Sequence, residues 1–129
     1  MLHNYDMPLA IKPVTGCYLQ RRFIKAPWNI YQDDPAWVPP LIMDMNHQLD
    51  PRNPYFSHAR VQSWIAYRGT KAVGRISAQI DRLHLEHHHE QCGFFGMLEA
   101  EDQQETFAAL LNTAQTWLQE RGMKSIMGP

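Results

Sequence analysis

The spacing of apolar residues predicts a long amphipathic helix near the C-terminal end of the chain. Between residues 102 and 121, apolar side chains recur three or four positions apart, as they do along one face of an α-helix. This stripe consists of Phe107, Leu110, Leu111, Ala114, Trp117 and Leu118. Asp102 followed by Glu105 resembles a capping box, and Gly122 is suited to ending the helix.

Before this helix, apolar and polar positions alternate with a period of two, which predicts β-strands. Residues 61–67 and 73–80 alternate in this way. Gly69 lies in the short turn between them, where a glycine readily takes a positive φ. In the first of these strands, Ile65 faces one way and Trp64 the other. The two segments therefore predict a β-hairpin.

A third strand and a short fourth one flank the predicted helix. Residues 91–99 form the third, and Gly93 and Gly96 within it indicate a bulge or a close backbone approach. Residues 124–127 read as a short buried strand after the helix. A strand, a helix and a following strand imply a right-handed crossover onto a partly parallel sheet.

Prolines divide the first half of the chain into short elements. Residues 1–10 read as a loose leader, and residues 14–18 as a short first strand. Residues 19–31 have helical spacing, and Pro27 inside them predicts either a break or the start of a new helix. Residues 41–49 predict one or two further helical turns.

The composition predicts one folded domain and narrows its partners. The chain has 129 residues, of which 44% are hydrophobic, enough for a real core. A formal charge of -1 does not predict the basic surface that would bind nucleic acid or an anionic membrane. No apolar run approaches the length of a membrane span, and the first residues lack a signal-peptide pattern. We therefore expect a cytoplasmic protein with neither nucleic-acid nor membrane partners.

The thiols and histidines offer weaker chemical signals. Cys17 and Cys92 lack CxxC spacing, so we expect two reduced thiols. Cys92 lies in an apolar strand, which favours an inert buried thiol over a nucleophile. Residues 83–90 form a polar segment with four histidines, and on a helix His84 and His88 would share a face, as metal ligands can. Without an HExxH motif, a solvated loop is favoured over a metal site, and we predict no bound metal.

Several short motifs add to what these patterns predict. They are Phe23-Ile24 with Pro27-Trp28-x-Ile30-Tyr31, Asp34-Pro35-x-Trp37-Val38-Pro39-Pro40-Leu41, Asp50-Pro51 with Asn53-Pro54-x-Phe56-x-His58-Ala59, Val73-Gly74-Arg75-Ile76, Gly93-Phe94-Phe95-Gly96, and Gly128-Pro129. Together they cover most of the chain. The set resembles the GNAT superfamily of N-acetyltransferases, in particular a group of uncharacterised bacterial GNAT-like proteins that are considerably longer than this chain.

The resemblance implies an α/β fold, an incomplete GNAT-like domain with a mixed, mostly antiparallel sheet and a crossover helix at residues 102–121. It implies a single domain over residues 1–129 that is truncated after the strand ending near Met127, the N-terminal part of a longer protein. The implied activity is acetyl transfer from acetyl-CoA to a small-molecule or peptide amine. The alternatives are an inactive chain and a non-catalytic module that completes its open sheet edge with a partner or a second copy.

The resemblance also implies site residues. The strand before the main helix splays from its neighbour and binds the pantetheine arm of the donor, which places Met97 and Leu98 at the cofactor. The start of the helix receives the pyrophosphate, which adds Gln103, Gln104 and Thr106. The loop here has no glycine and carries four carboxylates, those of Glu99, Glu101, Asp102 and Glu105.

Glu99 corresponds to the general base of the family, and the alternative is a solvated strand-end carboxylate. The usual acid, a tyrosine on a later helix, falls outside the chain. Five aromatic residues either shape an acceptor pocket or pack short helices together. They are Trp28, Tyr31, Trp37, Tyr55 and Phe56.

Overall fold

A five-stranded sheet with the order β1-β2-β3-β4-β5 forms the centre of the computed structural model, which describes residues 7–39 and 42–128. The first four strands are antiparallel, and β5 runs parallel to β4. The strands are β1 (Leu9–Pro13), β2 (Ala59–Arg68), β3 (Lys71–Asp81), β4 (Cys92–Ala100) and β5 (Ser125–Met127). The predicted hairpin, third strand and parallel final strand are confirmed.

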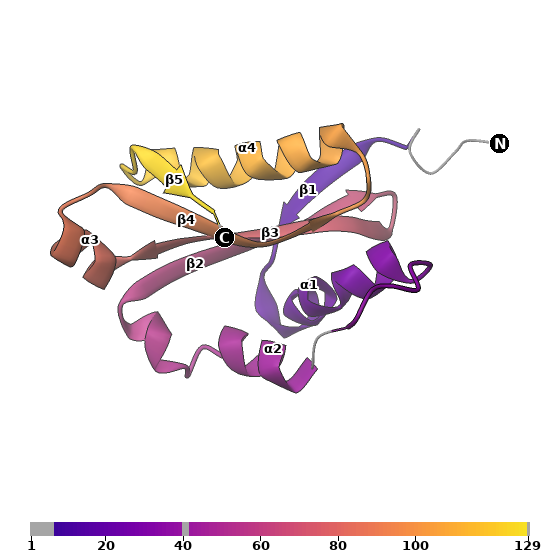
Figure 1. Cartoon of the computed structure of the whole chain (residues 1–129), viewed down its shortest axis with the longest axis horizontal. Helices are drawn as coiled ribbons and strands as arrows, with labels where there is room; N and C mark the ends of the chain where they lie inside the picture. The colour runs from indigo at the N-terminus through magenta and orange to yellow at the C-terminus, as the bar shows by residue number, and fades with distance from the viewer. Residues whose placement is uncertain (1–6, 40–41, 129) are drawn as a thin grey trace.

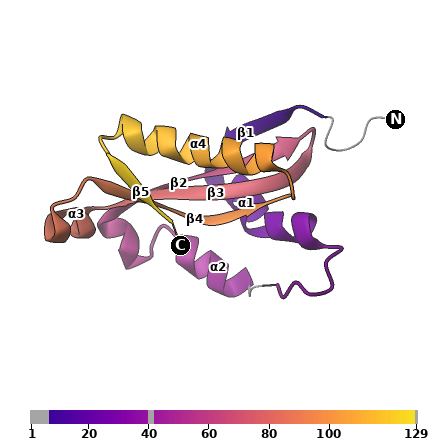
Figure 2. The same cartoon turned by 45° about the horizontal axis from the view of Figure 1, so that its top comes forward.

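Helices cover both faces of this sheet (Figure 1). The helices are α1 (Gly16–Tyr31), α2 (Ile42–Leu49), the 3-10 helix η2 (Pro54–Ser57), α3 (Arg82–His88) and α4 (Gln104–Glu120). Figure 2 shows α4 lying along one face, with α1 and α2 on the opposite face. The predicted turns at residues 41–49 are confirmed for α2, and Leu41 lies outside the described residues.

The alternation along β2 sends its side chains into two different cores. Trp64 and Ala66 pack with Leu110, Ala114 and Leu118 of α4 in one core. Ile65 packs with Phe23 and Ala26 of α1 in the other. The predicted division of these side chains between the two sheet faces is confirmed.

The first strand and the first helix begin earlier than the sequence predicts. Strand β1 occupies part of the predicted leader, and the predicted strand at residues 14–18 is wrong, because α1 begins at Gly16. Thr15 is extended, with φ -131° and ψ 126°, and Gly16 takes a φ of 79°. This positive φ is accessible to glycine at little cost, so the chain turns here from β1 into the helix.

Helix α1 continues through Pro27, although a proline there predicts a break. Proline has no N–H to donate to the carbonyl four residues earlier, which belongs to Phe23. Arg75 Nη1 instead donates to that Phe23 oxygen at 2.9 Å and to the Ile24 oxygen at 3.3 Å. A guanidinium from β3 thus satisfies the carbonyl that Pro27 leaves open.

The predicted polar loop at residues 83–90 is wrong for its first part, which forms α3. The Asp81 side chain caps this helix by accepting from the backbone amides of Leu83 and His84. His58 Nδ1 lies 2.9 Å from the same carboxyl. Burial acts to raise the pKa of Asp81, but the hydrogen bonds from His58 and from the two amides lower it overall.

The predicted side-chain cap of the long helix is also wrong. Helix α4 has Gln103 as its N-cap, one residue after the expected Asp102, and no side-chain hydrogen bond forms at the cap. At the other end, Gly122 has a φ of 85° and its amide bonds the Gln119 oxygen at 3.0 Å. The predicted glycine stop is confirmed.

Candidate functional site

The edge of β4 that faces β5 is paired only at its start. Strand β5 pairs with residues 92–94 of β4. Beyond them, none of the described strands pairs with this edge of β4, although its other edge is bonded to β3 as far as Ala100. A strand with free N–H and C=O groups is a template for an extended ligand. Met97 and Leu98, predicted to contact the donor, lie on this open stretch.

A β-bulge interrupts β4 at the same place. Ser77 pairs with Gly96 and Arg75 pairs with Glu99, so Met97 and Leu98 together oppose only Ile76. Met97 has a φ of 53°, an uncommon conformation for a non-glycine residue. Bulges of this kind re-aim side chains near functional sites. Here Met97 joins the α1-side core, whereas Leu98 packs in the α4-side core.

Glu99 lies directly after the bulge and interacts with α1. The Tyr31 hydroxyl donates a short hydrogen bond to Glu99 Oε2. Burial, followed by this hydrogen bond, raises the pKa of Tyr31 to about 12. The phenol is therefore neutral at physiological pH and holds the carboxylate as an acceptor. The Glu99 carboxylate, the predicted candidate for a base, thus has a hydrogen-bond partner on α1.

A buried cation lies beneath this pair. Arg75 is only 4% exposed, and its Nε donates to the Met97 oxygen at 3.1 Å. The guanidinium thereby connects the bulge to the α1 carbonyls that it also bonds. Burial lowers the pKa of Arg75, while the negative charge of Glu99 opposes that effect.

The four carboxylates before α4 differ in their surroundings, and two of them contact the guanidinium of Arg68. Glu101 is buried and its Oε1 accepts from Arg68 Nε at 2.5 Å. Glu105 Oε2 lies 3.4 Å from the same guanidinium. With Glu99 bonded to Tyr31, only Asp102 of the four points to solvent without a described partner.

The three residues predicted to bind the donor at the start of α4 differ in their surroundings. Gln103 is the N-cap and Gln104 is the first helical residue. The Thr106 side chain is fully buried and hydrogen-bonds within the network of Arg68 and Glu101. Only backbone atoms of Thr106 reach the helix end, where its amide bonds the Gln103 oxygen at 3.1 Å.

Two uncharged hollows lie on the Glu99 side of the sheet, beside α2 and η2. One of about 330 Å³ reaches the bulge at Gly96 and Met97. A neighbouring one of about 270 Å³ shares Leu49, Phe56 and Val61 with it. No charged side chain of the described residues lines either hollow, so both suit an uncharged, partly apolar ligand group.

The five aromatic residues separate into two groups. Trp28, Tyr31 and Trp37 pack together, with ring centroids 5.3 Å and 5.7 Å apart. Tyr55 and Phe56 form a second group in η2, with centroids 5.8 Å apart. The first group contains Tyr31, which bonds Glu99. The second group lines the larger hollow. Each group therefore both packs helices and borders the candidate site.

The remaining sequence candidates lie away from this site. His84 and His88 stack on α3 with centroids 4.4 Å apart, but no group of three metal-ligating side chains occurs in the described part of the chain. Cys92 is buried and Cys17 exposed, and neither forms a disulfide. Within residues 7–39 and 42–128, every helix is too short or too polar to cross a bilayer.

Sequence comparisons identify two longer relatives. The chain is 43% identical over 109 residues to Protein YghO of Escherichia coli (strain K12), covering 84% of this chain and 28% of that protein. It is 42% identical over 123 residues to the bacterial ceramide synthase of Caulobacter vibrioides, covering 94% of this chain and 32% of that enzyme. The chain thus spans about a third of the length of these relatives. No family profile matches it.

Solved structures identify the fold. A tandem GNAT protein from the clavulanic acid biosynthesis pathway superimposes with a TM-score of 0.70 at 13% identity, covering 94% of this chain and 36% of that one. An aminoglycoside acetyltransferase from an uncultured soil metagenomic sample, in complex with sisomicin, gives 0.64 at 13% identity, covering 94% and 76%. The aminoglycoside N-acetyltransferase AAC(6')-Iy, in complex with CoA, gives 0.60 at 14% identity, covering 95% and 77%. The chain has the GNAT fold, as its motifs predict.

Proposed function

We propose that the chain carries the donor-binding strand edge and the catalytic base of an N-acyltransferase. Such an enzyme forms an amide from an acyl thioester and a primary amine. The observation that carries the proposal is the position of Glu99, held by Tyr31 next to the bulge and the open edge of β4. The fold of the GNAT acetyltransferases supports the same reaction class.

Glu99 supplies the proton acceptor that this reaction needs. An amine is protonated at neutral pH and has no lone pair for attack until it loses a proton. The Glu99 carboxylate takes that proton, and the amine nitrogen then attacks the thioester carbon. The C–N bond forms, the C–S bond breaks, and the leaving thiolate takes this first proton from the Glu99–Tyr31 pair. Tyr31 is neutral and is hydrogen-bonded to the base, so it can relay this proton. The nitrogen, which is positively charged after attack, then gives its second proton to Glu99, and Glu99 releases it to water.

The donor we propose is an acyl-CoA, with acetyl-CoA the form that the GNAT resemblance suggests. The open edge of β4 at Met97 and Leu98 suits an extended pantetheine arm with amide groups of its own. The start of α4 would face the phosphates with the backbone amides of Gln104 and Glu105, since the Gln103 amide donates to the Glu101 oxygen at 2.7 Å. The missing side-chain cap and the inward Glu101 support this role, whereas the absence of a glycine limits how closely phosphate can approach.

For the acceptor we propose a long-chain amine. A ceramide is by definition the amide of a long-chain amine and a fatty acid, and one relative is named a bacterial ceramide synthase. The two uncharged hollows offer room for an uncharged chain, because Leu49, Phe56 and Val61 form walls that they share, with polar side chains such as Gln62 and Gln79 beside them. The larger hollow ends at Met97, two residues before the proposed base, so an amine at Glu99 could extend its chain into both.

Product analysis by mass spectrometry tests the proposed function. The protein would be incubated with acyl-CoA and sphinganine and the N-acyl product quantified. Replacing a general base typically costs about 10²–10⁴-fold in rate, so we expect Glu99→Gln to lose at least about 100-fold. Glu90→Gln is the matched control, because Glu90 is exposed next to β4. No amide from the wild-type protein, or equal rates for Glu99→Gln, would refute the proposal.

One observation favours a second candidate, a non-catalytic module that completes its sheet with a partner or a second copy. Strand β5 pairs with β4 on one side, and none of the described strands pairs with its other side. Met127 on this strand is 51% exposed. Unpaired edges promote strand addition. Light scattering distinguishes the candidates: a concentration-dependent dimer without CoA binding favours the module, and a monomer excludes the second copy as its partner.

A further inference from the structure

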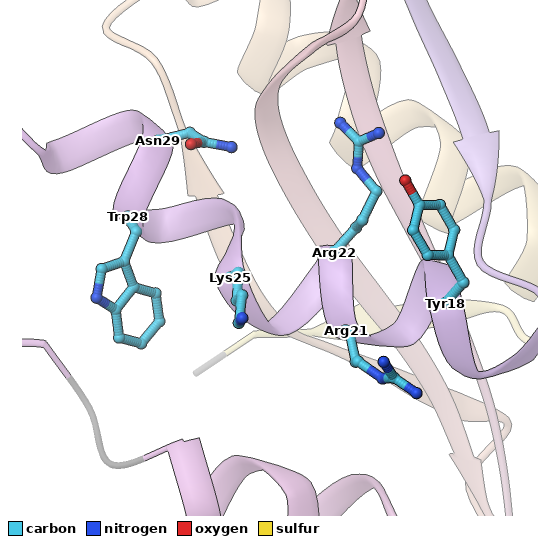
Figure 3. A pocket seen from close by; sticks show the side chains of 6 residues that line it. All are labelled: Tyr18, Arg21, Arg22, Lys25, Trp28 and Asn29. Carbon is cyan, nitrogen blue, oxygen red and sulfur yellow. The ribbon is translucent and has the colours of Figure 1, made fainter.

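We propose that the outward face of α1 docks on an anionic lipid membrane. This surface, here called the α1 basic face, consists of Tyr18, Arg21, Arg22, Lys25, Trp28 and Asn29, which line a shallow hollow. In Figure 3, Arg22 and Tyr18 extend to one side of the helix and Arg21 and Trp28 to the other, with Lys25 between them. The proposal goes beyond acyl transfer, and membrane binding can be measured whether or not the protein is active.

The charge on this face is concentrated and of one sign. Helix α1 has 16 residues, three cations on its outward side and no acidic residue. Arg21 and Lys25 are exposed and pair with no described acidic side chain. Arg22 donates to the Thr70 oxygen at 3.0 Å, which keeps its guanidinium at the surface. The formal charge of -1 for the whole chain therefore conceals a local basic patch.

The aromatic residues beside these cations favour a lipid interface. Tyr18 is 68% exposed, and Trp28 packs edge-on against Trp37 at the rim of the face. Val38, the neighbour of Trp37, is 84% exposed. Trp and Tyr side chains are enriched where a protein meets the membrane–water interface. The cations would also attract a DNA duplex, but the 84% exposed Val38 suits lipid better than a phosphate backbone.

The location of the α1 basic face would place the acyl-transfer site near the lipid. This consequence rests on the proposed function. Helix α1 lies on the same side of the sheet as Glu99 and both uncharged hollows. A protein docked through α1 would therefore bring its acceptor side, and not the α4 side, toward the lipid. A long-chain amine dissolved in that lipid would then have a short path to the site.

Vesicle flotation tests this proposal with the protein as it is. The vesicles contain phosphatidylcholine alone or phosphatidylcholine with phosphatidylglycerol, at low and at physiological salt. A cation near an anionic bilayer contributes about 1 kcal/mol, so the double variant Arg21→Gln/Lys25→Gln should lose about 30-fold in affinity for the anionic vesicles. The matched control Arg60→Gln/Lys124→Gln removes the same charge from exposed positions outside α1 and should lose less than about threefold.

A second variant separates lipid docking from simple charge attraction. Tyr18→Ser keeps every charge and removes the exposed ring, and we expect it to weaken binding to anionic vesicles several-fold. A DNA duplex at the same salt should bind weakly and without any effect of Tyr18→Ser. The proposal is overturned if wild-type protein does not float with anionic vesicles. It is also overturned if both charge variants lose equally, or if the duplex competes as well as lipid.

Discussion

At the scale of single residues, Arg75 links a helix, a bulge and the proposed base. Its guanidinium bonds the oxygens of Phe23, Ile24 and Met97, all from a buried position. A buried carbonyl left without a donor costs about 1–3 kcal/mol. The same side chain therefore positions the strand next to Glu99 and allows α1 to accommodate Pro27.

This gives a prediction that couples two positions 48 residues apart in the sequence. Arg75→Met should lower the free energy of unfolding by about 3 kcal/mol, since it leaves buried carbonyls unpaired. In a Pro27→Ala background, the new backbone N–H at that position can donate to the Phe23 oxygen, so the cost should fall by about 1 kcal/mol. A double-mutant cycle from urea unfolding measures this difference. Strictly additive effects would contradict the role assigned to Arg75.

Tyr31 predicts a dependence of stability on alkaline pH. Its pKa is raised to about 12, above the value of about 10 for an exposed tyrosine. The neutral phenol therefore stabilises the fold fully below pH 10, and this contribution is lost as the pH rises through 12. The stability advantage of wild type over Tyr31→Phe should be constant from pH 7 to 9 and shrink above pH 10. Urea unfolding across this range checks it, and an advantage that grows above pH 10 would contradict it.

The sequence could predict Glu99 at this scale, but not the residues that hold it. Glu99 was a candidate because the GNAT resemblance implies a carboxylate base near the end of this strand. Tyr31 is 68 residues away from it, and Arg75 is 52 residues away from the carbonyl of Phe23. Such partners carry no local pattern. The one available signal was Pro27 within a helical period. Because proline has no N–H, the Phe23 carbonyl needs a donor from elsewhere in the fold.

At the scale of elements, Gly93 lets α4 pack closely against β4. A Cβ atom at this position would lie 2.5 Å from Leu118 Cδ2, whereas one at Gly96 would lie 3.7 Å from Ser77 Oγ. Leu118 is only 1% exposed and has little room to move. The two glycines of β4 thus have different roles. Gly93 lets Leu118 of α4 pack close to the strand, and Gly96 precedes the bulge.

Alanine substitutions should separate these two glycines. Gly93→Ala inserts a methyl group into a packed contact, which typically costs about 1–3 kcal/mol. Gly96→Ala meets only an ordinary contact and should change stability by less than about 0.5 kcal/mol. Thermal and urea unfolding of the two variants measure the difference. Equal effects at both positions would contradict the packing of α4 described above.

The elements that the sequence predicts poorly are those whose local signals compete with tertiary contacts. The period-two strands and the stripe of α4 were predictable because each has one buried face. Strand β1 was missed because it is short and pairs only with β2. Helix α3 was missed because its polar residues have no apolar period, and its start depends on the Asp81 cap.

At the scale of the whole molecule, the fold brings three separate features to one side of the sheet. These are the proposed base Glu99, the uncharged hollows beside α2 and η2, and the α1 basic face. The open edge of β4 runs from the bulge toward the start of α4, which follows β4 in the chain. This arrangement fits a donor arm that enters along β4 and an acceptor that enters from the α1 side.

Calorimetric titration with CoA tests this account most directly, because donor binding at the β4 edge underlies the proposed reaction. We expect a saturable heat with a Kd below about 1 mM, which corresponds to about -4 kcal/mol. The adenosine 3′,5′-bisphosphate portion alone should bind far more weakly, since the loop before α4 has no glycine and the strand edge would contact the pantetheine arm. An absence of heat at high micromolar CoA would contradict the account.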